Sequence, residues 1–162
     1  MASAFFSPCH WGVAWGAIHR GWARSASGNT AEGILWIEQG IRDYRATGRV
    51  ASLPYSLLLK AEALHLADRT TEALEAINEA EALAEGLEQR AYCAELHRLR
   101  GVFLAALGAD GTQTEASFRE AIRIAREQKS ISLAKRAEAT YAEYCRQKTS
   151  GSGGRGFRLP LW

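Results

Sequence analysis

The sequence predicts an all-α protein: a solenoid of about three antiparallel helix pairs followed by a C-terminal capping helix. The first observation is composition, because only 3 of the 162 residues are proline and the middle of the chain is dominated by Ala, Leu, Glu and Arg. The second is an internal repeat with a period of about 40 residues, which is typical of stacked helical hairpins. With 47% hydrophobic residues, the chain can bury a sizeable core.

The first helix of each predicted pair carries a small residue and ends at a turn former. The small residues are 40 positions apart: Gly21, Ala61 and Gly101. The turn residues have the same spacing: Gly28, Asp68 and Gly108. Such residues are common where a helix stops, so we expect the first helices to end there.

The second helix of each pair places a large apolar residue three positions before a small one. The large residues are Ile37, Ile77 and Phe118, and the small residues are Gly40, Ala80 and Ala121. Their spacings are 40 and 41 residues. This pattern predicts three repeat units and therefore one repeating architecture.

These patterns assign residues 1–148 to one helical repeat domain, with units at about 8–47, 52–86 and 88–128 and a capping helix at 131–148. Pro54 fits a first helical turn, and Gly86 fits the end of the second helix of its unit. Thr112 and Glu115 have the spacing of a capping box. Residues 149–162 form a predicted Gly-rich tail with an apolar end, Phe157–Trp162.

Gly101 lies inside an apolar helical stretch, where glycine costs about 1 kcal/mol relative to alanine. Two helices of one hairpin pack at about 8–10 Å, and a small residue at their crossing allows the closest approach. We therefore expect close helix packing at this position to offset the lost helix propensity.

Several function classes are not favoured. The net charge of +2 gives no general argument for nucleic acid, and no run of about 18 apolar residues predicts a membrane span. The N-terminus lacks a signal-peptide pattern and the three cysteines form no C-x-x-C pair, so we expect a reducing cytoplasm. The G-x-G-x-x-G at 151–156 follows a helix and precedes only six residues, which fits a linker. We expect no enzyme activity, cofactor or metal.

The repeat units resemble the tetratricopeptide repeat (TPR). Ala61, Asp68, Ala73, Ile77 and Ala80 follow that family's order of small, turn, small, large and small residues, although its usual period is 34 residues. The resemblance implies a right-handed solenoid whose first helices line a concave, peptide-binding groove. Three stretches are more specifically similar to the C-terminal helical region of large bacterial regulators with an adenylate-cyclase-like domain and a signalling ATPase: GWARSASGNTAEGILWIEQGIRDYRATG, AELHRLRG and REAIRIAREQKSISLAKRAE.

The resemblance places nine residues on the groove face of the first helices. They are Trp15, Ile18, Trp22, Tyr55, Leu58, Glu62, His65, Arg98 and Val102. Aromatic anchors with a few polar groups suit the recognition of a protein or peptide. The alternative is that about half of them pack between hairpins. Since Ile18, Trp22 and Glu62 stand where the family's carboxylate clamp would begin, recognition of a peptide C-terminus is not expected.

Charge is unevenly distributed along the sequence. Residues 61–90 hold eight acidic and two basic side chains, whereas residues 119–158 hold ten basic and four acidic ones. The alternatives are solvated helix faces or association of copies into a homo-oligomer, through opposite charges or through the tail. Glutamates interrupt the basic region, which disfavours nucleic acid. The sequence thus predicts a non-catalytic, cytoplasmic protein-binding module, or alternatively a regulatory arm for a bacterial cyclase or ATPase.

Overall fold

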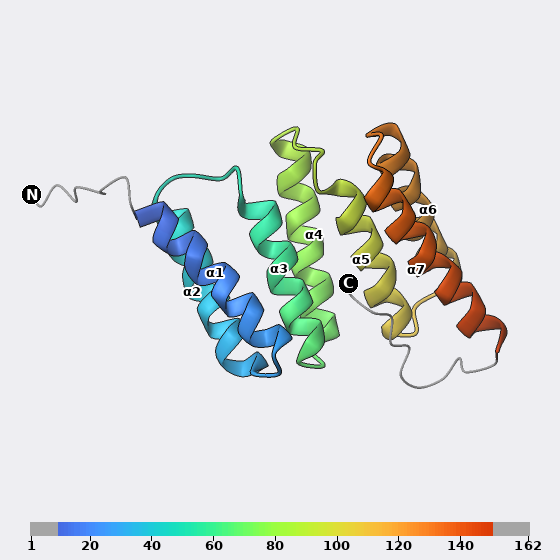
Figure 1. Ribbon diagram of the computed structural model, residues 1–162, viewed down its shortest axis with the longest axis horizontal. Coiled ribbons are helices and arrows are strands. Elements are labelled where there is room, and N and C mark those ends of the chain that lie inside the picture. Colours follow the sequence, from blue (N-terminus) through green and yellow to red (C-terminus); the bar gives the residue numbers. More distant parts are fainter. Residues whose placement is uncertain (1–9, 151–162) are drawn as a thin grey trace, which may run out of the picture. The chain divides into compact units, whose positions relative to one another are not determined.

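Residues 10–150 are described by a computed structural model, and within this range the chain is entirely helical. Seven α-helices are present between residues 10 and 150, and no strand occurs there (Figure 1). The all-α prediction is therefore confirmed. The predicted linker at 151–156 and apolar end at 157–162 lie outside the described residues.

The described chain divides into two compact units. Unit 1 comprises residues 10–76 and unit 2 comprises residues 77–150, so the boundary falls inside one helix, α4 (Thr70–Gly86). The sequence had suggested one repeat domain over the same region. Each unit has its own core and its own set of contacting helices.

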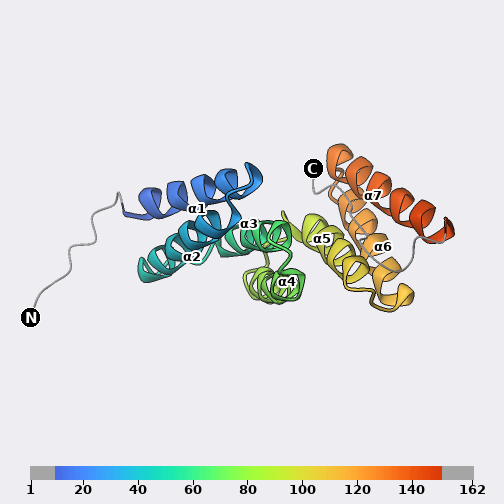
Figure 2. The same cartoon turned by 90° about the horizontal axis from the view of Figure 1, so that it is seen from below.

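Unit 1 is built from α1 (His10–Ala26), α2 (Thr30–Ala46), α3 (Leu53–Leu66) and the start of α4. The helices α1, α2 and α3 contact one another, and α1 and α2 lie side by side in both views (Figures 1 and 2). Each presents apolar residues at helical spacing to the shared interior, where burial is the main stabilising term. The buried apolar side chains of this unit include Ile18, Ile37, Ile41, Leu57 and Leu64.

Glycine allows α1 and α2 to approach each other closely. A Cβ atom on Gly21 would lie 2.6 Å from the carbonyl oxygen of Gly33 and 2.9 Å from the backbone nitrogen of Ile37. A Cβ atom on Gly40 would lie 2.8 Å from the carbonyl oxygen of Ala14. These distances leave no room for a methyl group, so the backbones of α1 and α2 are in direct contact at these glycines.

Unit 2 contains the end of α4, then α5 (Cys93–Ala106), α6 (Gly111–Glu127) and α7 (Ile131–Thr149). As in unit 1, three successive helices contact one another, here α5, α6 and α7. Phe118 lies at the centre with 0% exposure, and its ring centroid is 5.7 Å from that of Tyr141 and 5.5 Å from that of Tyr144. Gly101 faces the same ring, because a Cβ atom there would lie 2.6 Å from the nearest ring carbon.

The helix ends recur with the spacing seen in the sequence. The helices α1, α3 and α5 end at Ala26, Leu66 and Ala106. The residue two positions later adopts a left-handed backbone each time: Gly28 (φ 98°), Asp68 (φ 59°) and Gly108 (φ 68°). The amide of the following residue then donates a hydrogen bond back into the helix, as from Asn29 to the carbonyl of Arg24 at 3.0 Å. This is the Schellman arrangement, which satisfies carbonyls at a helix end.

A second set of left-handed residues ends the second helices. Gly48 (φ 74°), Glu88 (φ 52°) and Lys129 (φ 55°) follow α2, α4 and α6. Gly48 is a typical turn residue, but the sequence does not predict the set, because Glu88 and Lys129 carry no signal for a left-handed backbone. The capping box predicted at Thr112 is wrong, since α6 begins at Gly111 with Asp110 as its N-cap and no side-chain capping bond.

Within the described part of the chain, none of the helices combines the length and the apolar character that crossing a bilayer requires.

Candidate functional site

The nine residues predicted to line a groove differ widely in exposure. Five are buried, and so they do not form an exposed surface: Ile18 (0%), Leu58 (4%), Glu62 (5%), Arg98 (1%) and Val102 (0%). The other four are partly exposed: Trp15, Trp22, Tyr55 and His65. The partly exposed residues all belong to unit 1. This is where the structure offers a surface of the predicted kind.

An aromatic cluster joins the helices of unit 1. The ring of Trp15 on α1 lies 5.7 Å from that of Tyr55 on α3 and 6.4 Å from that of Tyr44 on α2, measured between centroids. His19 lies 4.6 Å from Trp15 and 5.8 Å from Tyr55, and its Nδ1 is 2.9 Å from the Trp15 carbonyl oxygen. We call Trp15, His19 and Tyr55, the partly exposed members, the aromatic cluster.

A hydrogen bond joins the same two helices about two turns further along. Nε1 of Trp22 on α1 donates to Oε2 of Glu62 on α3 at 2.6 Å. These residues occupy equivalent positions in the first two repeats, exactly one period of 40 residues apart in the sequence. A buried carboxylate needs such a partner, because removing it from water is otherwise costly. Trp22 and Glu62 therefore help to join α1 to α3.

Arg98 is buried inside unit 2, whereas the sequence predicts it on the face of a groove. Its guanidinium donates to both carboxylate oxygens of Glu95, at 3.0 and 2.6 Å, and to the hydroxyl of Thr140 on α7 at 3.4 Å. Arg136 adds a second cation 3.3 Å from Glu95. Since Arg98 is only 1% exposed, this network connects α5 to α7 inside unit 2.

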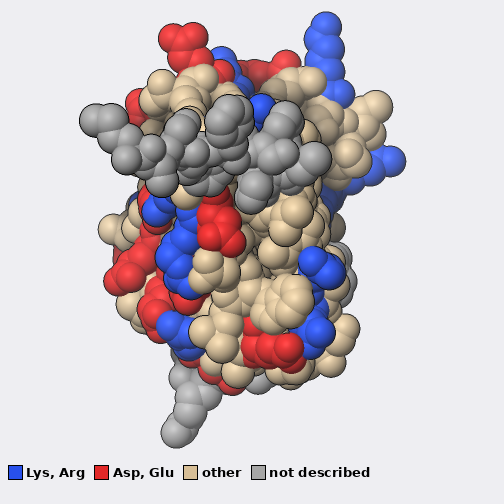
Figure 3. Space-filling model, turned by 90° about the vertical axis from the view of Figure 1, so that its left-hand side faces the viewer, with Lys and Arg blue, Asp and Glu red and all other residues tan. Residues whose placement is uncertain are grey.

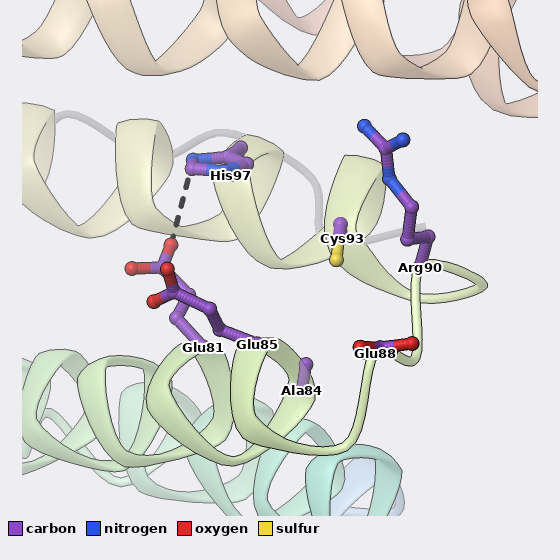
Figure 4. Close-up of a pocket in the computed structure, with 7 residues that line it drawn as sticks. All are labelled: Glu81, Ala84, Glu85, Glu88, Arg90, Cys93 and His97. Atoms are coloured by element: carbon purple, nitrogen blue, oxygen red, sulfur yellow. Dashed lines mark ion pairs between the residues drawn. The ribbon is translucent and has the colours of Figure 1, made fainter.

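Unit 2 has a hollow of about 590 Å³ between the end of α4 and the start of α5 (Figure 4). We call it the acidic pocket; its lining residues are Glu81, Ala84, Glu85, Glu88, Arg90, Cys93 and His97. Glu81 and Glu85 extend from α4 toward His97 on α5, and the sulfur of Cys93 faces α4. The loop between the helices contributes Glu88 and Arg90. Three carboxylates therefore converge on one concavity.

The charges around the acidic pocket are only partly balanced. One carboxylate oxygen of Glu81 is bound by Arg100, and the other lies 3.5 Å from Nδ1 of His97 without forming a hydrogen bond. Burial raises the pKa of the Cys93 thiol, which therefore stays protonated at neutral pH. Arg90 extends away from α4 and lies 3.9 Å from Glu127.

A second, smaller hollow of about 390 Å³ surrounds the start of α6. Lys148 of α7 forms a 2.9 Å ion pair there with Glu115 of α6. Bonding to Lys148 lowers the pKa of the Glu115 carboxyl, and the same bond raises the pKa of the Lys148 amine. Because Glu115 also accepts a hydrogen bond from Arg119, the charge of Glu115 is balanced by two cations.

Charges of both signs are mixed on one face of the molecule. On the face shown in Figure 3, Lys and Arg side chains lie among Asp and Glu side chains. Among residues 10–150, no group of three or more His, Cys, Asp or Glu side chains is arranged to hold a metal ion. The two surfaces that stand out are therefore the aromatic cluster and the acidic pocket.

Part of the aromatic cluster is predictable from the sequence, whereas the acidic pocket is not. Trp15 and Tyr55 were predicted, but His19 was not, because its contact depends on the distance between α1 and α3. The sequence did show the acidic excess over residues 61–90. A more specific signal is the position of two acidic residues at a helix end. Glu85 lies in the last turn of α4 and Glu88 just after it, where basic residues are usually preferred.

Comparison with known proteins finds a relative whose own function is not described. The chain is 33% identical over 126 residues, 78% of its length, to a protein of Rhizobium meliloti (strain 1021) described as uncharacterized. The matched region is 12% of that relative, so the chain spans about an eighth of its length. No protein-family model matches the sequence. No solved structure matches it either.

Proposed function

We propose that the chain is a TPR-like helical-repeat module that binds a segment of a protein partner without catalysing a reaction. The proposal is supported by the recurrence of helix ends and left-handed turn residues at a spacing of 40–41 residues. It is also supported by the same three-helix contact pattern in each unit. Stacked hairpins of this kind present rigid surfaces formed by several helices, and repeat proteins bind partners on such surfaces.

The aromatic cluster is the observation that carries this proposal. Trp15, His19 and Tyr55 come from two helices and keep part of their rings exposed. Large, rigid aromatic side chains contribute contact area at little cost in conformational entropy, and Trp and Tyr are enriched among residues that dominate binding energy. The imidazole of His19 adds a polar group that can orient a bound segment.

Selection of a displayed random-peptide library on the immobilised chain tests this proposal. Enriched peptides are synthesised and their affinity measured by fluorescence polarisation. We expect Trp15→Ala or Tyr55→Ala to weaken binding at least tenfold, because loss of an anchoring aromatic costs about 2 kcal/mol or more. Trp36→Ala is the matched control, since Trp36 lies on α2 against Arg20 and Arg24.

Circular dichroism must show that each variant keeps its helical content. Selected peptides that bind all three variants equally would contradict the assignment of the aromatic cluster. Failure to enrich any peptide, or measurable turnover of a substrate by the purified chain, would contradict the proposal as a whole.

The second candidate function is a regulatory arm for a bacterial cyclase or ATPase. The observation that favours it is the length of the relative, in which the matched region is a small part of a much longer protein. Cyclic-AMP synthesis and ATP hydrolysis by the full relative, with and without its matched region, test this candidate. A change in either activity on deletion supports it, and the absence of both activities contradicts it.

A further inference from the structure

We propose that an exposed side of α1 and α2 in unit 1 docks a further hairpin of the same repeat, joined ahead of α1 in a longer polypeptide, whose second helix supplies a carboxylate to Arg20. We call this side the open face; its residues are Val13, Gly16, Arg20, Ala23, Arg24 and Trp36. The inference goes beyond the proposed function, because it concerns the packing of repeats and does not require the aromatic cluster to bind a peptide.

The first argument is a difference in exposure between equivalent positions of α1 and α3. On α3, which packs against α1 and α2, Leu53 is 3% exposed and Ala63 is fully buried. The equivalent residues of α1, 40 positions earlier, are exposed: Val13, at 66%, and Ala23. A Cβ atom added to Gly16 would meet nothing within 4 Å. Because a solenoid repeat packs against its neighbours in sequence, the open face corresponds to a side that the preceding hairpin covers in the next repeat.

The second argument is a basic residue that recurs with the repeat. Arg20, Lys60 and Arg100 lie 40 positions apart, on α1, α3 and α5. Nζ of Lys60 is 3.1 Å from Oε1 of Glu38 on α2, and Arg100 forms an ion pair with Glu81 on α4. In both cases the carboxylate belongs to the second helix of the preceding hairpin. The ion pair is therefore a repeated contact between successive hairpins.

Arg20 is the member of this series that lacks a carboxylate. Its guanidinium carbon lies 5.2 Å from the centroid of the Trp36 ring, and it takes part in no ion pair with residues 10–150. Arg24 lies 5.1 Å from the same ring and pairs with Glu32 at 2.6 Å. A hairpin placed before α1 as the α1–α2 hairpin is placed before α3 would bring the missing carboxylate to Arg20.

Charge and length favour this occupant over a second copy of the chain. Two copies meeting through their open faces would bring Arg20 and Arg24 of one against those of the other, and the neighbouring Glu32 already pairs with Arg24. Like charges brought together in this way are unfavourable, so self-association through the open face is not expected. The relative from Rhizobium meliloti is about eight times as long as the matched region, which leaves room for further hairpins in one polypeptide.

The test adds one repeat to the whole chain, by inserting a second copy of residues 10–49 directly before His10. The 40-residue spacing is kept, so the added second helix precedes α1 as α2 precedes α3. Val13→Cys in the original repeat introduces a thiol, whose alkylation is followed by mass spectrometry in the chain and in the extended protein. We expect alkylation at least about tenfold slower in the extended protein, because the equivalent Leu53 is buried. Alkylation of Cys145, which is exposed on α7, should be unchanged.

Charge reversal tests the contact made by Arg20. In the extended protein, Arg20→Glu in the original repeat should speed alkylation of the introduced thiol about two- to fivefold, as expected for loss of a partly exposed ion pair. Glu38→Arg in the added copy should restore the slower rate. In the unextended chain, Arg20→Glu should leave the rate unchanged. Lys135→Glu removes an exposed cation from α7 in unit 2, so it is the control and should leave both proteins unaffected.

Sedimentation equilibrium of the unextended chain tests the source of the occupant. We expect a monomer, and a dimer that Val13→Asp dissociates would overturn the choice of a hairpin in the same polypeptide. An unchanged alkylation rate in the extended protein, whether or not the added copy folds, would overturn the inference as a whole. If Glu38→Arg fails to restore protection, the ion pair assigned to Arg20 is wrong.

Discussion

Replacing Gly21 with alanine should destabilise unit 1, although alanine is the better helix former. The added Cβ would lie 2.6 Å from the carbonyl oxygen of Gly33 and 2.9 Å from the backbone nitrogen of Ile37. Both atoms belong to the backbone of α2, so no side-chain rotation relieves the clash and the helices must move apart. Overpacking costs about 1–3 kcal/mol, whereas the gain in helix propensity is about 0.5–1 kcal/mol.

We therefore expect the free energy of unfolding to fall by about 1–2 kcal/mol in Gly21→Ala, since the clash involves rigid backbone and its cost lies at the upper end of the overpacking range. Gly16→Ala on the same helix is the control, because a Cβ there meets nothing within 4 Å. It should raise stability by about 0.5–1 kcal/mol.

Urea unfolding followed by tryptophan fluorescence measures both effects in unit 1. Four of the five tryptophans lie in that unit: Trp11, Trp15, Trp22 and Trp36. The fifth, Trp162, is replaced by phenylalanine in the background protein. If Gly21→Ala proves as stable as Gly16→Ala, the spacing of α1 and α2 does not depend on the small residue, and the reasoning fails.

Three further predictions concern unit 2. Arg98→Met should lower the free energy of unfolding by about 3 kcal/mol in urea denaturation, since Glu95 loses its buried partner, and the added Glu95→Leu change should restore most of that loss. The Glu115 carboxyl has a lowered pKa in the folded chain, so its pairing with Lys148 stabilises the fold above the ordinary value of 4.5 and is lost as pH falls through the lowered value. A carbon-13 NMR titration should show this midpoint moving up toward 4.5 in Lys148→Gln; an unchanged midpoint would contradict the assigned cause. Lys129→Gly should raise the free energy of unfolding, measured in urea, by up to about 1 kcal/mol, because Lys129 holds a left-handed backbone at φ 55°.

The sequence was sufficient to predict the helices and where most of them end. Gly28, Asp68 and Gly108 were recognised as stop residues because glycine and aspartate favour turns, and all three are left-handed in the structure. Glu88 and Lys129 adopt the same backbone without such a signal. Their conformation follows from the helix-end hydrogen bonds of the surrounding residues, which composition alone does not encode.

The candidate site was harder to predict, because exposure depends on neighbours that the repeat does not specify. Ile18, Leu58 and Arg98 occupy equivalent positions in successive repeats, and all three are buried. The first two are apolar and need no explanation. Arg98 is buried because Glu95, one helical turn earlier, forms a bidentate ion pair with it. Repeat position alone therefore predicts an exposed residue at Arg98, whereas the structure buries it in an ion pair.

Residues at equivalent repeat positions thus share a similar backbone environment, but their side chains make different contacts. Trp22 and Glu62 are one repeat apart, and one donates a hydrogen bond to the other. The next equivalent residue, Val102, is apolar and fully buried. The small residues Gly21 and Gly101 play the same structural role in their repeats. Each lies where a neighbouring helix leaves no space for a Cβ atom. What differs between the units is therefore the side chains carried on this backbone: the aromatic cluster in unit 1 and the acidic pocket in unit 2.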